Sequence, residues 1–183
     1  MIAGILSTQE DICAGLLLVA RSEKRLDAIA SELEAGKAPG ISIETTTSLS
    51  RLKSADILIL CANTNDPLVY PHHISPLKPV LISDLSVPSA LAKETASLPN
   101  VIIMPFAAYV CMPEDPGAVI SSYSPAGTVF CCAAEAMLLG LEPFPLPLKG
   151  HLLPGSMRKV AELAEKHGLF NHLGSIKSYK VTT

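Results

Sequence analysis

Short continuous runs of apolar residues recur along the first hundred residues, and segments with helical spacing separate them. Such runs are typical of strands that are covered on both faces, while a shorter alternating run predicts a half-buried strand. Strands are expected at 16–20, 41–45, 56–61, 79–83 and 100–104. Helices are expected between them at 22–36, 49–53 and 89–97. Strands alternating with helices predict a parallel sheet built by right-handed crossovers.

The pattern changes after residue 105. A loop rich in proline, glycine and serine is expected at 113–125, where Ser124-Pro125 resembles the start of a helix that continues through Leu141. Three prolines make 142–147 an extended connector. A final amphipathic helix is expected from Ser156 to His167, and Gly168 would stop it.

Composition supports one domain over residues 1–183, with a nucleotide-binding part at 16–104 and a C-terminal loop and helical part at 105–183. Hydrophobic residues make up 49% of the chain and charged residues 17%, as expected of a largely buried sheet. The predicted fold class is therefore α/β: a Rossmann-like, mostly parallel sheet with flanking helices, whose first strand and glycine-rich turn are incomplete.

Several classes of function are disfavoured by charge and cysteine usage. A net charge of −3 gives no basic surface for nucleic acid. The five cysteines have no metal-ligand spacing and predict reduced thiols in a cytoplasmic protein, and His72-His73 reads as a surface pair. The uncharged stretch 116–134 is interrupted by Ser121 to Pro125, so no transmembrane segment is expected.

Candidate cofactor residues follow the predicted strands, at the carboxyl ends where ligands of doubly wound sheets bind. Arg21 and Ser22 offer donors to a 2′-phosphate and favour NADP, although they also fit a solvated helix start. Ala62 and Asn63, with Thr64, lie where such folds approach the nicotinamide ribose. Asp84 could contact a ligand or cap the next helix, and the sequence leaves both readings open.

The cradle for the pyrophosphate is missing from the sequence. A strand, a GxGxxG turn and a helix would need about 30 residues before Leu16. Residues 1–15 contain single glycines at positions 4 and 15. The expectation is a truncated product, a pseudo-enzyme, or a site that another chain completes.

Two blocks resemble one family. The apolar segment 130–139 is similar to the helix that carries the reactive cysteine in aldehyde-forming long-chain acyl-acyl-carrier-protein reductases, and 156–170 is similar to that family's closing helix. Residues 17–22, 25–26 and 55–57 resemble its NADPH-binding part. The resemblance runs collinearly over about 16–170 and places the family's nucleophile at Cys132.

The resemblance implies a chemistry. A Cys132 thiolate would take the acyl group from an acyl-carrier-protein thioester, and NADPH would reduce the acyl-enzyme to an aldehyde. If the helix begins at Pro125, Cys132 lies two turns inside it, so a cation such as His167 or Lys166, or bound cofactor, would have to stabilise the thiolate. Ala107-Ala108 replaces a glycine pair of the family, and its N-terminal substrate-binding region is absent.

Two other readings remain open. Residues 83–88 also resemble the strand end of glutamyl-tRNA reductase and shikimate-dehydrogenase-type NADP-dependent domains, which act on polar substrates. A chain without its pyrophosphate turn could also be a non-catalytic fragment, or an oligomerising or regulatory domain.

Overall fold

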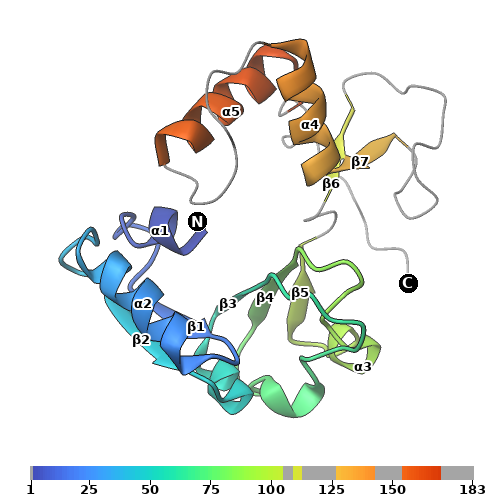
Figure 1. Cartoon of the computed structure of the whole chain (residues 1–183). Coiled ribbons are helices and arrows are strands. Elements are labelled where there is room, and N and C mark those ends of the chain that lie inside the picture. Colours follow the sequence, from blue (N-terminus) through green and yellow to red (C-terminus); the bar gives the residue numbers. More distant parts are fainter. Residues whose placement is uncertain (1, 105–108, 113–126, 143–153, 170–183) are drawn as a thin grey trace. The chain divides into compact units, whose positions relative to one another are not determined.

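The computed structural model describes residues 2–104, 109–112, 127–142 and 154–169. It divides into two compact units, Met1–Ala107 and Ala108–Thr183 (Figure 1). The chain is of mixed α/β type, with parallel sheets flanked by helices.

A two-stranded parallel sheet opens the first unit. Strand β1 (Gly15–Val19) pairs with β2 (Ser42–Thr46), and helix α2 (Glu23–Glu34) connects the two strands and packs on them. The Ser22 hydroxyl oxygen accepts a hydrogen bond from the Arg25 backbone N–H at 3.4 Å, which confirms the predicted start of α2. A short helix, α1 (Ile2–Leu6), precedes β1.

A three-stranded parallel sheet completes the first unit. Its strands follow the order β3 (Ile57–Leu60), β4 (Val80–Asp84) and β5 (Val101–Ile103). The connecting segments contain η1 (Leu49–Ser54), η2 (Pro71–His73) and α3 (Lys93–Ala96). All five predicted strands are thus confirmed, with each bound shifted by one residue.

One face of the three-stranded sheet carries the core of this unit. The buried cluster consists of Leu52, Leu58, Val69, Ile74, Val80, Ile82 and Leu91. Val19 of β1 packs against the cluster, which links the two sheets. On the other face, Ile57 is 53% and Ile102 is 56% exposed. The expectation of strands covered on both faces is therefore wrong for β3 and β5 in the described part of the chain.

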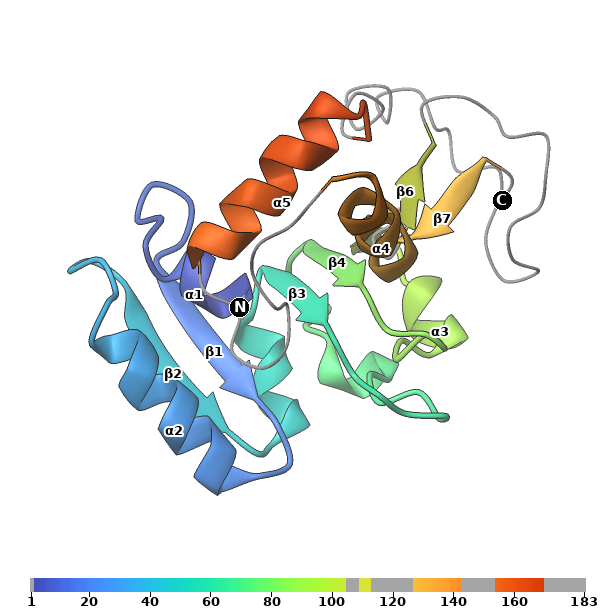
Figure 2. The ribbon, with the colours of Figure 1, turned by 45° about the horizontal axis from the view of Figure 1, so that its top comes forward.

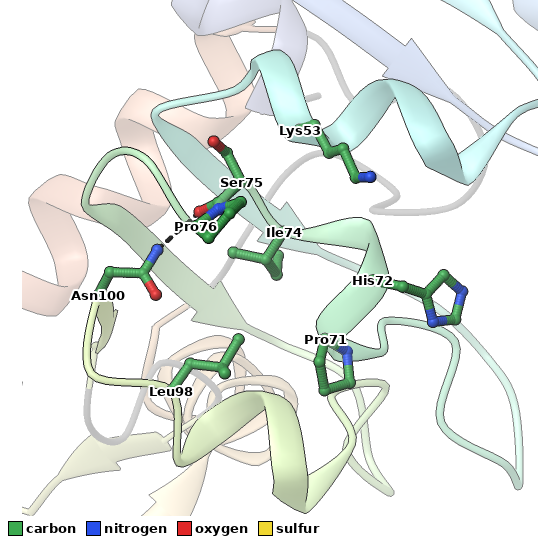
Figure 3. A pocket seen from close by; sticks show the side chains of 8 residues that line it. All are labelled: Lys53, Pro71, His72, Ile74, Ser75, Pro76, Leu98 and Asn100. Carbon is green, nitrogen blue, oxygen red and sulfur yellow. Dashed lines mark hydrogen bonds between the residues drawn. The ribbon is translucent and has the colours of Figure 1, made fainter.

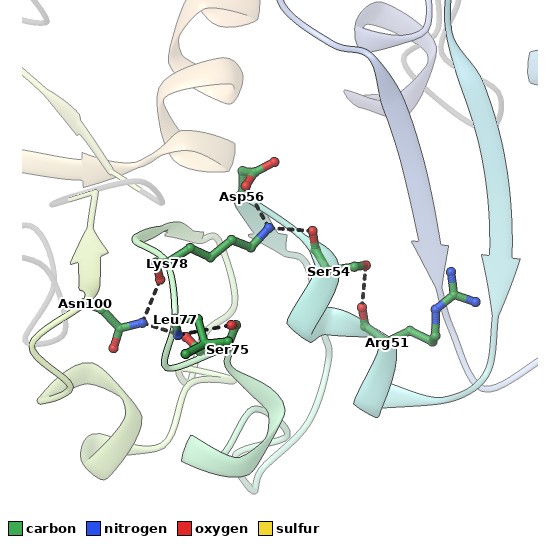
Figure 4. A network of polar contacts seen from close by, with 7 residues as sticks. All are labelled: Arg51, Ser54, Asp56, Ser75, Leu77, Lys78 and Asn100. Carbon is green, nitrogen blue, oxygen red and sulfur yellow. Dashed lines mark hydrogen bonds and ion pairs between the residues drawn. The ribbon is translucent and has the colours of Figure 1, made fainter.

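Polar side chains hold the amino ends of β3, β4 and β5 together (Figure 4). The Lys78 ammonium donates to the Ser54 carbonyl oxygen and to the Asp56 carboxylate, each at 2.7 Å. The Asn100 side-chain amide donates to the carbonyl oxygens of Ser75 at 2.7 Å and Lys78 at 2.8 Å. These residues precede the strands, so this end of the sheet is fixed by structural contacts.

The second unit combines an antiparallel strand pair with two helices. Strands β6 (Tyr109–Cys111) and β7 (Thr128–Phe130) pair antiparallel, and α4 (Cys131–Leu141) follows β7 directly. Helix α5 (Pro154–Lys166) packs against α4. The core of the unit is formed by Val129, Ala134, Leu138, Ala164 and Leu169.

Helix α5 ends at the predicted glycine. Gly168 has φ +77°, and its N–H donates to the Glu165 carbonyl oxygen at 3.1 Å. The Leu169 N–H donates to the Ala164 carbonyl oxygen at 2.8 Å, which completes a Schellman motif. Leu169 is 6% exposed, so the motif also inserts an apolar side chain into the core.

Two predicted helices need correction. The helix expected from Pro125 begins at Cys131, because Thr128–Phe130 form β7 and Val129 is 1% exposed against the rest of the unit. The helix expected at 89–97 is confined to Lys93–Ala96. Its first residues are held by other contacts, since Leu91 forms a β-bridge with Val69. The segments 113–126 and 143–153 lie outside the described residues.

Candidate functional site

The first candidate site lies after β1. Arg21 is exposed, and no ion pair or hydrogen bond joins its side chain to the described residues. Ser22 is half-buried and acts as the N-cap of α2, so its oxygen already accepts one hydrogen bond. Both residues do lie at the carboxyl end of a parallel strand, where the sequence placed them.

A hollow of about 350 Å³ lies beside these residues, between the start of α2 and the end of β2. It is lined by Glu23, Leu26, Asp27 and the threonines at 45–47. Two carboxylates disfavour a phosphate group in this hollow, because like charges repel at short range. A phosphate bound by Arg21 would therefore have to lie outside it.

The second candidate group follows β3. The Ala62 N–H donates to the Ser86 hydroxyl oxygen at 3.0 Å, which ties the end of β3 to the turn after β4. Asn63 is exposed, while the Thr64 hydroxyl bonds to the Asp66 backbone. Of this group, Asn63 has an exposed side chain that makes no hydrogen bond to the described residues, so it is the candidate for contact with a ligand.

Asp84 ends β4 and organises the turn that follows. Its carboxylate accepts hydrogen bonds from the Ser86 N–H at 2.9 Å, the Ser89 hydroxyl at 2.7 Å and the Ala90 N–H at 3.0 Å. The Leu91 N–H adds a longer contact at 3.3 Å. These contacts all lie in the turn that precedes α3, whose N-cap is Ala92 and receives no side-chain hydrogen bond, so the expectation that Asp84 caps the next helix is wrong. The carboxylate instead stabilises the turn, and this use leaves less of it for a ligand. The sequence did not reveal this role of Asp84, because its partners are backbone N–H groups and one hydroxyl, which leave no recognisable pattern in a sequence.

The same carboxylate affects a neighbouring thiol. Cys61 follows β3, and the pairing of Leu60 with Asp84 brings the thiol near that carboxylate. Burial, and then the negative charge of Asp84, raise the pKa of the Cys61 thiol. Cys61 is therefore a poor nucleophile at neutral pH, because the thiolate is the reactive form.

A second hollow, of about 260 Å³, lies at the opposite end of the same sheet (Figure 3). Lys53, His72 and Asn100 line it, together with apolar side chains. Asn100 already donates to two carbonyl oxygens there. Because ligands of parallel sheets bind at the carboxyl ends, this amino-end hollow is not the better site.

The adjacent histidines are engaged in local contacts. His73 Nδ1 accepts a hydrogen bond from the Tyr70 N–H at 3.1 Å, and the His72 ring stacks on Tyr70 with centroids 6.0 Å apart. Burial lowers the pKa of His73, and the neighbouring His72 and Lys53 add to this. Within the described residues, no group of three or more metal-ligating side chains comes together.

Cys132 lies in the first turn of α4, not two turns inside a helix as expected. Phe130 is the N-cap, so Cys131 and Cys132 are the first two helical residues. The first-turn N–H groups of a helix have no intrahelical acceptor and favour a negative charge nearby. Cys132 is exposed at this position, so a substrate can reach its sulfur atom.

The neighbouring cysteine is less suited to that role. Burial, and then interaction with Cys132, raise the pKa of the Cys131 thiol. Glu135, one turn further along α4, is half-buried.

The cations proposed to stabilise Cys132 are at the wrong end of the helix. Lys166 and His167 both bind the carboxylate of Glu142, the latter at 3.1 Å. Glu142 is the C-cap of α4, whose eleven residues span about 16 Å. The hydrogen bonds from Lys166 and His167 hold the pKa of Glu142 below its ordinary value. These groups join α5 to α4 and do not reach its first turn.

The described residues fit NADP only in part. Arg21 and Ser22 could meet a 2′-phosphate, but no glycine-rich turn at a helix start follows any described strand. Because the pyrophosphate needs such a turn, the described residues alone do not form a complete NADP site.

Comparison with known proteins adds no family assignment. No family model matches the chain, and no curated protein matches it. Across the described ranges, no helix is long and apolar enough to cross a membrane.

Proposed function

We propose that these residues carry the acyl-transfer part of an NADPH-dependent acyl-thioester reductase, with Cys132 as the nucleophile. The observation that carries the proposal is the exposed position of Cys132 in the first turn of α4. The resemblance of 130–139 and 156–170 to acyl-acyl-carrier-protein reductases supports the same assignment.

The proposed step is a thioester exchange, in which the acyl group moves from the carrier-protein thiol to Cys132. The Cys132 thiolate attacks the carbonyl carbon of a carrier-protein thioester, and a new carbon–sulfur bond forms. The bond to the carrier sulfur breaks, and the carrier leaves as a thiolate that takes up a proton. The full activity would also need hydride from NADPH, which would release the acyl group as a fatty aldehyde. This second step depends on a cofactor site that the described residues form only in part.

The face of α4 that bears Cys132 suits an acyl chain. Ala136 and Gly140 follow Cys132 at intervals of four residues and are exposed small residues. Beside them, Met137 is 37% and Leu141 is 64% exposed. An apolar chain attached to Cys132 could cover these side chains and remove them from water.

The experiment is to incubate the protein with a long-chain acyl-carrier-protein thioester and to map the covalent adduct by mass spectrometry. A mass increase equal to one acyl group on Cys132 is expected, with none in Cys132→Ser. Cys131→Ser is the matched control and should keep the adduct. If the folded protein forms no adduct at Cys132, the nucleophile assignment is wrong and a non-catalytic role is favoured.

A further inference from the structure

The two parallel sheets of the first unit each end at an unpaired strand. Among the described residues, β1 pairs with β2 alone and β3 pairs with β4 alone. β1 and β3 are the neighbouring strands of the two sheets in both views, and they run in the same general direction in Figure 2. We call the unpaired sides of β1 and β3 the open edges.

Hydrogen bonds show which backbone groups lie on the open edges. The Ala14 carbonyl and the Ala20 N–H bond to β2, so alternation turns the groups of Leu17 and Val19 the other way. Likewise, the carbonyl groups of Asp56 and Leu60 accept from the segment of β4, which turns the groups of Ile57 and Ile59 away. Both open edges therefore present backbone donors and acceptors that no described strand uses.

The residues of the open edges are those of interior strands. β1 reads GLLLV and β3 reads ILIL, without a charge or a proline. Natural edge strands are usually protected by such residues, because an unprotected edge pairs with other chains. β2, at the outer side of its sheet, reads SIETT and contains a charge. The contrast indicates that β1 and β3 are built to be paired on both sides.

One face of the three-stranded sheet is uncovered as well. Ile57 and Ile102 share a face through the register with Leu81, and Ile59 and Met104 continue it. Ile59 is 38% and Met104 is 44% exposed. In parallel sheets a crossover helix normally covers such a face.

We propose that the open edges bind one apolar β-strand from a polypeptide outside these 183 residues, parallel to β1 and β3, and that the helix following this strand covers Ile57 and Ile102. The sheet then has the order β2, β1, added strand, β3, β4, β5. This is the strand order of dinucleotide-binding sheets, in which the first strand and its turn lie at the centre. The proposal goes beyond the proposed function and does not depend on Cys132.

The added segment also accounts for the incomplete NADP site. Its turn would place a helix N-terminus at the carboxyl end of the sheet, where backbone N–H groups bind phosphates. That position lies between the ends of β1 and β3, which lead to Arg21 and Asn63.

The test uses the full chain and a synthetic peptide with a five-residue apolar strand, a Gly-x-Gly-x-x-Gly turn and a twelve-residue helix. Amide hydrogen exchange is measured with and without the peptide. Amides of Leu17, Val19, Ile57 and Ile59 should exchange at least about tenfold more slowly when the peptide is bound. A peptide of the same composition with two prolines in its strand is the control and should protect none of them.

Variants separate edge pairing from general stabilisation. Leu17→Pro removes an N–H on the open edge of β1 and should weaken peptide binding at least about tenfold. Thr45→Pro removes one on the outer side of β2 and is the matched control, with binding unchanged. If Leu17→Pro does not fold, Ile59→Pro makes the same test on β3.

Three results would overturn the proposal. One is protection of the four amides in the dilute protein alone, since the edges would then be paired already. Another is their protection only in a dimer of this chain, seen by sedimentation, since a second copy would then be the occupant. The third is no protection at saturating peptide. None of these readouts involves acyl transfer, so failure here leaves the Cys132 assignment untouched.

Discussion

Asp84 at the end of β4 and Cys132 at the start of α4 both lie where backbone N–H groups favour a negative charge. The Asp84 carboxylate directs its contacts to its own turn, with three hydrogen bonds of 3.0 Å or less. Cys132 is exposed in a first turn whose N–H groups lack intrahelical acceptors. In the first unit, the backbone N–H groups are therefore satisfied by a side chain of the protein itself. In the second unit, the comparable N–H groups lie beside an exposed thiol that a substrate can reach.

The largest effect is expected from breaking the Asp84 turn. Asp84→Ala leaves the N–H groups of Ser86 and Ala90 without their acceptor, and both residues are buried. Because each unsatisfied buried group costs about 1–3 kcal/mol, we expect a loss of about 3 kcal/mol in the free energy of unfolding, measured with urea. Asp66→Ala, at an exposed position, is the control. Equal effects of the two changes would contradict the structural role of Asp84.

A smaller loss is expected at the end of α5. Gly168 has φ +77°, so Gly168→Ala should cost about 1 kcal/mol in the free energy of unfolding. Gly140→Ala is the control within the same unit, because no atom lies within 4 Å of the added Cβ and alanine favours the helix. Thermal unfolding should therefore shift down for the first variant and not for the second. A shift in the same direction for both would contradict the assigned Schellman motif.

Acid should weaken the contact between α4 and α5. Hydrogen bonds from Lys166 and then His167 lower the pKa of Glu142 in the folded protein. A lowered folded pKa stabilises the protein above the ordinary carboxyl pKa, and this contribution is lost as pH falls through the folded value. Glu142→Gln should thus be less stable than the native protein at neutral pH, and the two should converge in acid. A difference that stays constant with pH would argue against the ion pair.

The smallest effect on folding is expected at Cys132 itself. Cys132→Ser changes an exposed side chain, so the free energy of unfolding should stay within about 0.5 kcal/mol of the native value. The free energies of unfolding of Cys132→Ser and Asp84→Ala, measured by urea unfolding under the same conditions, compare the two turns directly. A loss as large as that of Asp84→Ala would make Cys132 a structural residue.

The strands of the first unit, the start of α2 and the end of α5 followed from the sequence for physical reasons. Short apolar runs bounded by polar residues favour strands, the Ser22 side chain caps α2, and Gly168 adopts the positive φ that ends α5. The placement of Cys132 did not follow. An apolar run does not show where β7 ends and α4 begins, because pairing with β6 decides it. The open edges were also hidden, since a run such as ILIL predicts a strand but does not show which segments pair with it or cover it.

The most direct test of the central claim, that Cys132 is the reactive group, compares the thiols within one native protein. A short pulse of iodoacetamide at neutral pH, followed by peptide mapping, gives the alkylation rate of each cysteine, and Cys131→Ser resolves the adjacent pair. We predict that Cys132 is alkylated at least about tenfold faster than Cys61, whose raised pKa keeps it as the neutral thiol. Alkylation of Cys132 at the same rate as Cys61, or more slowly, would contradict the account.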